Sequence, residues 1–434
     1  MSGSRYASFI EGKTRRHGAS GIEVPESDIH QSLFRFQNAV ARWGLSKGKA
    51  CIFAGTGLGK TRMQCEIMRH IPGKRLLVSP LAVAEQTITE ARLLNGMRIK
   101  RIHSQDDVSG DGTYIINYDR LRTVEGINWD AVGLDESSII KSHDGSTREY
   151  IQDRFSATPY RYAFTATPSP NDYMELGTHA EFMGAMTRQE MFATFFVHDG
   201  GDTSKWRLKG HAVEDFWKWV SSWAVVFSHP RDIGYDQQGY DLPPLHIHDH
   251  IVQVESTIAD GLFGDGAISA TQLYPAMRES AESRALMVKQ IVDADPGNWL
   301  IWVYTDEDQR WVEKMVPGIA TVKGPDSNEQ KVDRLLGFAT GVYDSLVTKP
   351  KIAGFGMNWQ RTNKMIFNGI THSFEQVYQC IRRQWRFGQQ HPVNVHMVTC
   401  NAMETVRAAQ SAKQEAFLHM GTEMAKYCVQ EVSR

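Results

Sequence analysis

A glycine-rich segment in the first third of the chain has the residue types that bind nucleotide phosphates. It spans Phe53–Thr61 (FAGTGLGKT), follows an apolar run and precedes a helix-like stretch, with Ala54 in place of the usual first glycine. Glycines let backbone N–H groups converge on phosphate oxygens, and the helix that follows adds a favourable dipole. In such loops Lys60 reaches the β- and γ-phosphates and the Thr61 hydroxyl ligates magnesium. The segment therefore predicts a nucleotide site.

Two adjacent carboxylates, Asp135 and Glu136, follow the apolar run Ala131–Leu134. Ligands of open α/β sheets bind at the carboxyl ends of the strands, so we expect both acids beside the phosphate loop. We predict that Asp135 holds magnesium and that Glu136 orients or deprotonates an attacking water. An ordinary acidic pair at a strand end is the alternative, and the upstream loop favours the catalytic interpretation.

Short apolar runs that alternate with helical patterns must position these residues. Buried strands in such alternation predict a doubly wound α/β fold with parallel sheets. We expect one such domain over residues 31–184 and a second over residues 242–401. The expected strands contain Cys51–Ala54, Leu76–Ser79, Tyr114–Asn117, Ala131–Leu134, Tyr162–Thr165, His246–Val254, Trp299–Val303, Ile319–Val322, Ser345–Thr348, Lys364–Phe367 and Val393–Val398.

The remaining segments differ in composition. Residues 1–30 are polar and predict a flexible lead-in, and residues 402–434 predict a C-terminal helix. Residues 185–241 are rich in Met, Phe and Trp and predict a helical insertion or linker whose aromatic side chains form core.

Composition narrows the function classes. The chain has 434 residues, 41% of them hydrophobic, which excludes disorder as its main character. Its 48 Lys and Arg against 50 Asp and Glu exclude a binder held to DNA by net charge alone. Seven Lys or Arg against one acid between Lys349 and Pro392 nevertheless allow a local basic track. Five scattered cysteines, no signal-like N-terminus and no membrane-length apolar run predict a cytoplasmic protein.

Further motifs occur in a characteristic order along the chain. Phe36–Gln37 precedes the phosphate loop and Tyr162–Pro168 (YAFTATP) follows the acids, while Gly354–Gln360 and Gln379–Gln389 lie in the second half. Together with the loop and the acids, this set resembles superfamily 2 helicases and translocases. It is most similar to their Swi/Snf-like branch, whose last motif also ends in Arg-x-Gly-Gln. The compact layout resembles helicases of bacteriophages and prophages, and the resemblance covers roughly residues 33–400.

The resemblance implies two tandem RecA-like (P-loop NTPase) domains that hydrolyse ATP with magnesium. It implies that Gln37 reads adenine and that Arg383 and Arg386 stabilise charge on the γ-phosphate. The nucleotide-binding set is Gln37, Gly55, Thr56, Gly57, Gly59, Lys60, Thr61 and Gln379. The catalytic set is Lys60, Asp135, Glu136, Arg383 and Arg386, and the magnesium ligands are Thr61 and Asp135.

The same resemblance implies residues that couple hydrolysis to movement and residues that touch nucleic acid. The coupling residues are Thr165, Thr167, Gly356 and Asn358. The nucleic-acid-binding residues are Pro80, Asn117, Tyr118 and Lys323. The expected partner is nucleic acid, with DNA as the favoured polymer. We expect a monomer, since the arginines come from the same chain, with phage replication, recombination or restriction proteins as possible partners and the bacterial host cytoplasm as its location.

Two other functions remain open: the motor subunit of a restriction or packaging complex, and an ATP-gated nucleic-acid clamp with little unwinding. The second half carries the Gln379, Arg383 and Arg386 set rather than a nuclease acidic cluster, which argues against a packaging motor. The intact lysine, acids and arginines argue against a clamp. The acidic motif continues Ser137-Ser138, which departs from the commoner Asp-Glu-Ala-His and Asp-Glu-Ala-Asp forms and weakens assignment to a processive duplex-separating subclass.

Overall fold

The chain divides into two compact units. The computed structural model describes residues 17–142, 145–169, 173–199, 202–255, 270–353 and 358–432. Unit 1 consists of residues 1–238 and 416–434, and unit 2 of residues 239–415. In the described part, no helix is long and apolar enough to cross a membrane.

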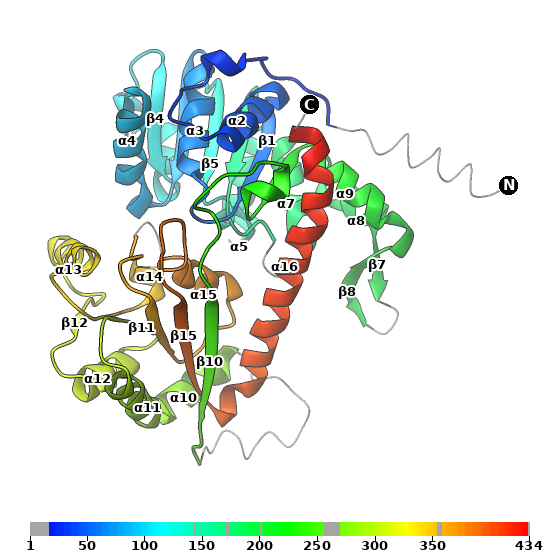
Figure 1. Cartoon of the computed structure of the whole chain (residues 1–434). Helices are drawn as coiled ribbons and strands as arrows, with labels where there is room; N and C mark the ends of the chain where they lie inside the picture. Colours follow the sequence, from blue (N-terminus) through cyan, green and yellow to red (C-terminus); the bar gives the residue numbers. More distant parts are fainter. Residues whose placement is uncertain are drawn as a thin grey trace. The chain divides into compact units, whose positions relative to one another are not determined.

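A seven-stranded parallel sheet organises unit 1, in the order β3-β4-β2-β5-β6-β1-β9 (Figure 1). Its central strands are almost entirely apolar and buried, as expected when helices cover both faces of a sheet. The strands are β1 (Lys49–Ala54), β2 (Lys74–Ser79), β3 (Ile99–Arg101), β4 (Gly112–Asn117), β5 (Ala131–Asp135), β6 (Tyr160–Phe164) and β9 (Ala224–Phe227). The main helices are α2 (Arg35–Lys47), α3 (Lys60–His70), α4 (Leu81–Asn95), α5 (Ile139–Ser142), α6 (Gly145–Phe155), α7 (Leu176–Met183), α8 (Arg188–Phe195) and α9 (Val213–Ser221).

Unit 2 contains a second parallel sheet, with six strands in the order β10-β15-β14-β11-β13-β12. The strands are β10 (Leu245–Val252), β11 (Trp299–Val303), β12 (Ala320–Thr321), β13 (Leu346–Thr348), β14 (Lys364–Asn368) and β15 (Val393–Cys400). The helices are α10 (Ala270–Glu279), α11 (Ala281–Ala294), α12 (Asp306–Met315), α13 (Asn328–Thr340), α14 (Pro350–Ala353), α15 (Phe374–Ile381) and the start of α16 (Glu404–Val432). The prediction of two parallel-sheet α/β domains is confirmed.

The segment between the domains differs from the helical insertion that we predicted over residues 185–241. It contains α8 and α9, but also an antiparallel hairpin of β7 (Phe196–Asp199) and β8 (Asp202–Leu208). Strand β9 then joins the main sheet beside β1. This segment forms a strand because Ala224–Phe227 is a buried apolar run with two β-branched valines. The tryptophans on either side of α9's end, Trp219 and Trp223, are buried core.

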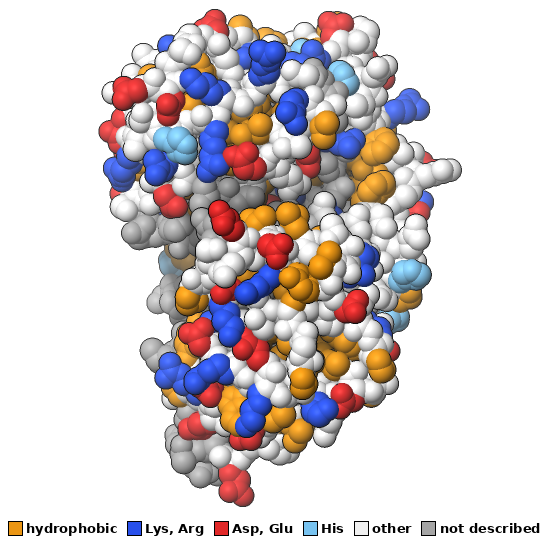
Figure 2. Space-filling view, turned by 90° about the vertical axis from the view of Figure 1, so that its left-hand side faces the viewer, with side chains coloured by type: hydrophobic (Ala, Val, Ile, Leu, Met, Phe, Trp, Pro, Cys, Tyr) orange, Lys and Arg blue, Asp and Glu red, His pale blue; other side chains and the backbone are white. Residues whose placement is uncertain are grey.

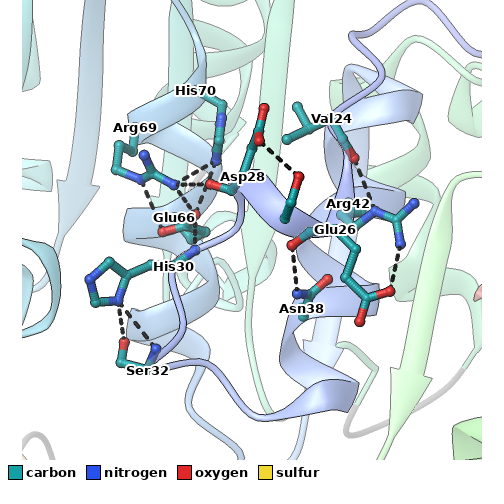
Figure 3. A network of polar contacts seen from close by, with 11 residues as sticks. Val24, Glu26, Asp28, His30, Ser32, Asn38, Arg42, Glu66, Arg69 and His70 are labelled. Atoms are coloured by element: carbon teal, nitrogen blue, oxygen red, sulfur yellow. Dashed lines mark hydrogen bonds and ion pairs between the residues drawn. The ribbon is translucent and has the colours of Figure 1, made fainter.

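The N-terminal segment is also better ordered than the flexible lead-in predicted over residues 1–30, in the part that is described. Backbone N–H groups of Ser20 and Ile22 donate to carbonyls in the last turn of α2, and Val24 and Ile29 are buried. Figure 3 shows how the segment reaches α3, where the backbone N–H of His30 donates to the Glu66 carboxylate at 3.0 Å. Polar composition therefore did not mean absence of structure, because these groups bond to helix ends.

Candidate active site

The phosphate loop connects the end of β1 to the start of α3. Gly57 and Gly59 have φ values of 90° and 81°, a region that favours glycine. A Cβ at Gly59 would also lie 2.3 Å from Nε2 of Gln37, so a larger residue would displace the Gln37 amide. The N–H of Gly55 donates to the Phe227 carbonyl at 2.9 Å, which ties the loop to β9. The loop therefore lies at the N-terminus of an eleven-residue helix, where anions are favoured.

Lys60 and Thr61 begin α3, as the sequence pattern requires. Nζ of Lys60 donates to the Ala54 carbonyl at 3.1 Å, which holds the ammonium group over the end of β1. Thr61 follows in the first helical turn and is half-buried. A cation and a hydroxyl thus flank the loop's backbone N–H groups.

Gln37 contacts the phosphate loop directly. Its side chain is buried; Oε1 accepts from the Phe34 backbone N–H at 3.0 Å, and Nε2 donates to the Leu58 carbonyl at 3.0 Å. These bonds join the start of α2 to the loop. Adenine recognition by Gln37 stays a prediction, and the geometry adds a second task, that of holding the loop in place.

The two acids lie at the carboxyl end of β5, on the same edge of the sheet as the loop. Burial and the neighbouring Glu136 raise the pKa of Asp135 to about 7, while the charge of Lys60 opposes this shift. Lys60 is therefore close enough to act electrostatically on Asp135. Glu136 has a φ of 48°, unusual for a non-glycine residue, and its backbone N–H donates to Oδ1 of Asp135 at 3.1 Å.

These residues fit a magnesium ion. Oε2 of Glu136 is buried and has no hydrogen-bond partner within the described part of the chain, and burial together with the neighbouring Glu136 disfavours the charge of Asp135. A divalent cation would relieve that repulsion, and carboxylate and hydroxyl oxygens are its preferred ligands. Thr61 and Asp135 would hold it. Among the described residues no cluster of three or more His, Cys, Asp or Glu side chains could hold a metal.

The segment Thr165–Pro168 follows β6, which lies between β5 and β1 in the sheet. The N–H of Thr165 donates to the Ile52 carbonyl at 3.4 Å, and its hydroxyl accepts from the N–H of Thr167 at 3.1 Å. Both threonine side chains are fully buried. This segment is thus held between the strand of the loop and the strand of the acids.

Three of the four residues predicted to touch nucleic acid lie at neighbouring strand ends in unit 1. Pro80 follows β2 and precedes α4, and Asn117 ends β4. Tyr118 follows Asn117 and is half-buried: its hydroxyl donates to the Asp135 carbonyl at 2.9 Å, and burial raises its pKa. Sequence reasoning missed this contact, since seventeen residues separate the partners and no spacing rule joins them. Nucleic-acid contact at these residues stays a prediction.

In unit 2 the final motif lies on α15 and the loop after it. Gln379 and Arg383 are buried, and the Arg383 carbonyl accepts from the N–H of Trp359 at 3.0 Å. Arg386 donates to Oδ1 of Asn358, so the structure brings a predicted catalytic arginine and a predicted coupling residue together. Gly356 lies outside the described residues.

The loop that carries Arg386 is held by Gln384 and by Gln389, the glutamine that ends the motif, and the sequence analysis assigned a role to neither side chain. Nε2 of Gln384 donates to the Thr362 hydroxyl at 2.6 Å, and Nε2 of Gln389 donates to the Gln384 carbonyl at 3.2 Å. Arg382 is buried, with its guanidinium 5.0 Å from the centre of the Trp385 ring.

Lys323, predicted to bind nucleic acid, follows β12 in unit 2. Its ammonium group pairs with Glu313 at 2.8 Å, and its backbone N–H donates to the Asp326 carboxylate at 2.8 Å. Its side chain is 42% exposed. A role in strand contact stays a prediction and requires that phosphate compete with Glu313.

Comparison with known proteins gives a structural match only. No protein-family model matches the sequence, and no curated protein matches it either. Among solved structures, the chain is similar to the SWI2/SNF2 ATPase core of Sulfolobus solfataricus in complex with dsDNA, at 15% sequence identity and a TM-score of 0.44. The match covers 95% of this chain and 99% of that chain.

Proposed function

We propose that this chain is an ATP-dependent motor that hydrolyses ATP and moves along nucleic acid, with DNA as the favoured track. The observation that carries the proposal is the meeting of Lys60, Asp135 and Glu136 at one edge of the unit 1 sheet. A phosphate-binding loop, a cation and two carboxylates are the parts that phosphoryl transfer to water requires. Bound magnesium would neutralise charge on the phosphates, and Glu136 would orient the attacking water.

Unit 2 completes the proposed motor. Arg383 and Arg386 carry the planar, permanently charged group that stabilises a transferring phosphoryl group. Hydrolysis would then depend on closure of the two units around ATP, and closure and reopening would move one unit along the strand. The motif order along the chain supports this division of roles.

The motifs favour translocation along nucleic acid over separation of its strands. The Asp135–Ser138 motif departs from the forms common in processive duplex-separating enzymes. We therefore propose tracking along DNA as the primary activity and helicase action as its extension.

The test measures steady-state ATP hydrolysis with single-stranded DNA, duplex DNA, RNA or no polymer, alongside a strand-displacement assay. We expect DNA to stimulate hydrolysis. Lys60→Ala and Glu136→Gln should each abolish the stimulated turnover, because one removes phosphate charge stabilisation and the other the water-orienting carboxylate. Asp153→Asn, an exposed change in the same unit, should keep full turnover. Unchanged turnover in both site variants would rule out this mechanism.

A further inference from the structure

A buried histidine lies beneath the acids in unit 1. His179 is on α7 and is fully buried among apolar neighbours on that helix such as Leu176 and Ala180. Its Nε2 is hydrogen-bonded to the Ser137 hydroxyl at 3.0 Å, and Ser137 is itself fully buried. A buried imidazole is costly unless it is bonded, whereas an apolar side chain would fill the position without that cost. The polar group therefore calls for an explanation beyond packing.

Ser137 directly follows Glu136, and it anchors a strained point of the backbone. Glu136 has a φ of 48°, a conformation that costs about 1 kcal/mol or more and persists only where surroundings impose it. On one side, its N–H is held by Oδ1 of Asp135. On the other, the N–H of Ser137 donates to the Phe164 carbonyl at 2.9 Å and its hydroxyl meets His179. The direction of the Glu136 carboxylate is thus set partly by the Ser137 contacts.

His179 also packs against the strand that leads into the phosphate loop. The edge of one ring meets the face of the other where His179 contacts Phe53, with centroids 5.1 Å apart and planes at 79°. Phe53 immediately precedes Ala54, whose carbonyl accepts from Lys60. One buried side chain therefore contacts the residue after the acids and the residue before the loop. It is carried by the helix that follows the Thr165–Pro168 segment.

We infer that His179 is a positioning residue for ATP hydrolysis: through Ser137 it fixes Glu136 in the orientation that presents its carboxylate to the attacking water. This inference rests on the proposed function and deepens it. Because Lys60 and the loop bind phosphate without help from Ser137, the contact should matter for turnover and little for ATP affinity.

The test compares kcat and KM for ATP in four variants with DNA present. His179→Leu removes the hydrogen bond, Ser137→Ala removes its partner, and His179→Gln keeps a polar atom at a similar reach. We expect at least a tenfold loss of kcat in His179→Leu and in Ser137→Ala, with KM changed less than twofold. His179→Gln should stay within threefold of the parent. The double variant, His179→Leu with Ser137→Ala, should be no slower than the slower of these two single variants, since each substitution removes the same contact.

Thr178→Val is the matched control, because Thr178 is buried beside His179 on α7 and makes a near-isosteric change possible. It should keep kcat within twofold. If His179→Leu does not fold, Ser137→Ala and His179→Gln still decide, as both nearly preserve core volume. A parent-like kcat in Ser137→Ala, or losses of kcat that multiply in the double variant, would overturn the inference about His179 and leave the proposed function standing. A parent protein without DNA-stimulated hydrolysis would instead remove the proposed function, and the inference with it.

Discussion

At the residue scale, local patterns predicted the parts of the site that lie on consecutive residues. The phosphate loop was recognisable because its glycines, Lys60 and Thr61 follow a strand within a few positions, and because strand ends share one edge of a parallel sheet. The contacts of Tyr118 with Asp135 and of His179 with Ser137 were not predictable. Each joins segments far apart in sequence, and neither leaves a spacing signature.

Asp135 gives a prediction about stability and pH. Burial and Glu136 raise its pKa to about 7, above the value near 3.8 of an exposed aspartate. The unfolded chain therefore loses this proton first as pH rises, and Asp135 costs stability progressively between about pH 4 and pH 7. Asp135→Asn should exceed the parent in unfolding free energy at pH 8, by at most about 4 kcal/mol. The advantage should vanish at pH 4.

Urea unfolding followed by tryptophan fluorescence checks this prediction, without nucleotide or magnesium. Asp153→Asn, which changes an exposed carboxylate, should show no such pH dependence. Equal stability of Asp135→Asn and parent at pH 8 would mean that burial and Glu136 do not raise the pKa of Asp135 in the folded protein.

At the element scale, apolar runs predicted the strands well because buried parallel strands need continuous hydrophobicity. The short strand β3 was missed, since Ile99–Arg101 contains one apolar residue and two basic ones. Strand β9 was hidden within an aromatic-rich segment, although its run of small and β-branched residues was a usable signal. The defined conformation of residues 17–30 was not predicted because it depends on hydrogen bonds to α2 and α3, which composition does not reveal.

The joint between the N-terminal segment and α3 can be tested at Glu66. Its carboxylate is buried, which would raise its pKa, but hydrogen bonds from His70, Arg69 and the His30 backbone lower the pKa to about 2. Because the folded value lies below the unfolded one, the interaction stabilises the protein above about pH 4.5. That stabilisation is lost as pH falls towards 2. Glu66→Gln should therefore lower the unfolding free energy by about 2 kcal/mol at pH 7, as measured by urea unfolding.

Glu85→Gln provides the comparison, because Glu85 forms an exposed ion pair with Arg101. Exposed pairs contribute at most about 1 kcal/mol, so this variant should unfold close to the parent. If both variants lose the same small amount across the pH range, the segment is not anchored through Glu66.

At the scale of the whole molecule, 48 Lys and Arg nearly balance 50 Asp and Glu. On the face in Figure 2, Lys and Arg side chains are interspersed with Asp and Glu.

The long helix α16 contributes residues 404–415 to unit 2 and its remainder to unit 1, where the N–H of Val226 on β9 donates to Sγ of Cys428 at 3.4 Å. We predicted residues 402–434 as a separate C-terminal helix, and the structure divides this helix between the two units. Its two ends pack in different cores.

The proposed dependence of hydrolysis on both units yields the last prediction. Arg386 lies in unit 2 and donates to Asn358, whereas the loop and the acids lie in unit 1. If Arg386 stabilises the transferring phosphoryl group, Arg386→Ala should lower kcat by about 1,000-fold while a fluorescent ATP analogue binds within twofold of the parent. Arg386→Lys should not restore turnover, because an ammonium lacks the planar fork. Arg310 is an exposed arginine of the same unit, and Arg310→Ala should leave both kcat and analogue binding unchanged. If Arg386→Ala also left kcat unchanged, unit 1 would hydrolyse ATP without this arginine.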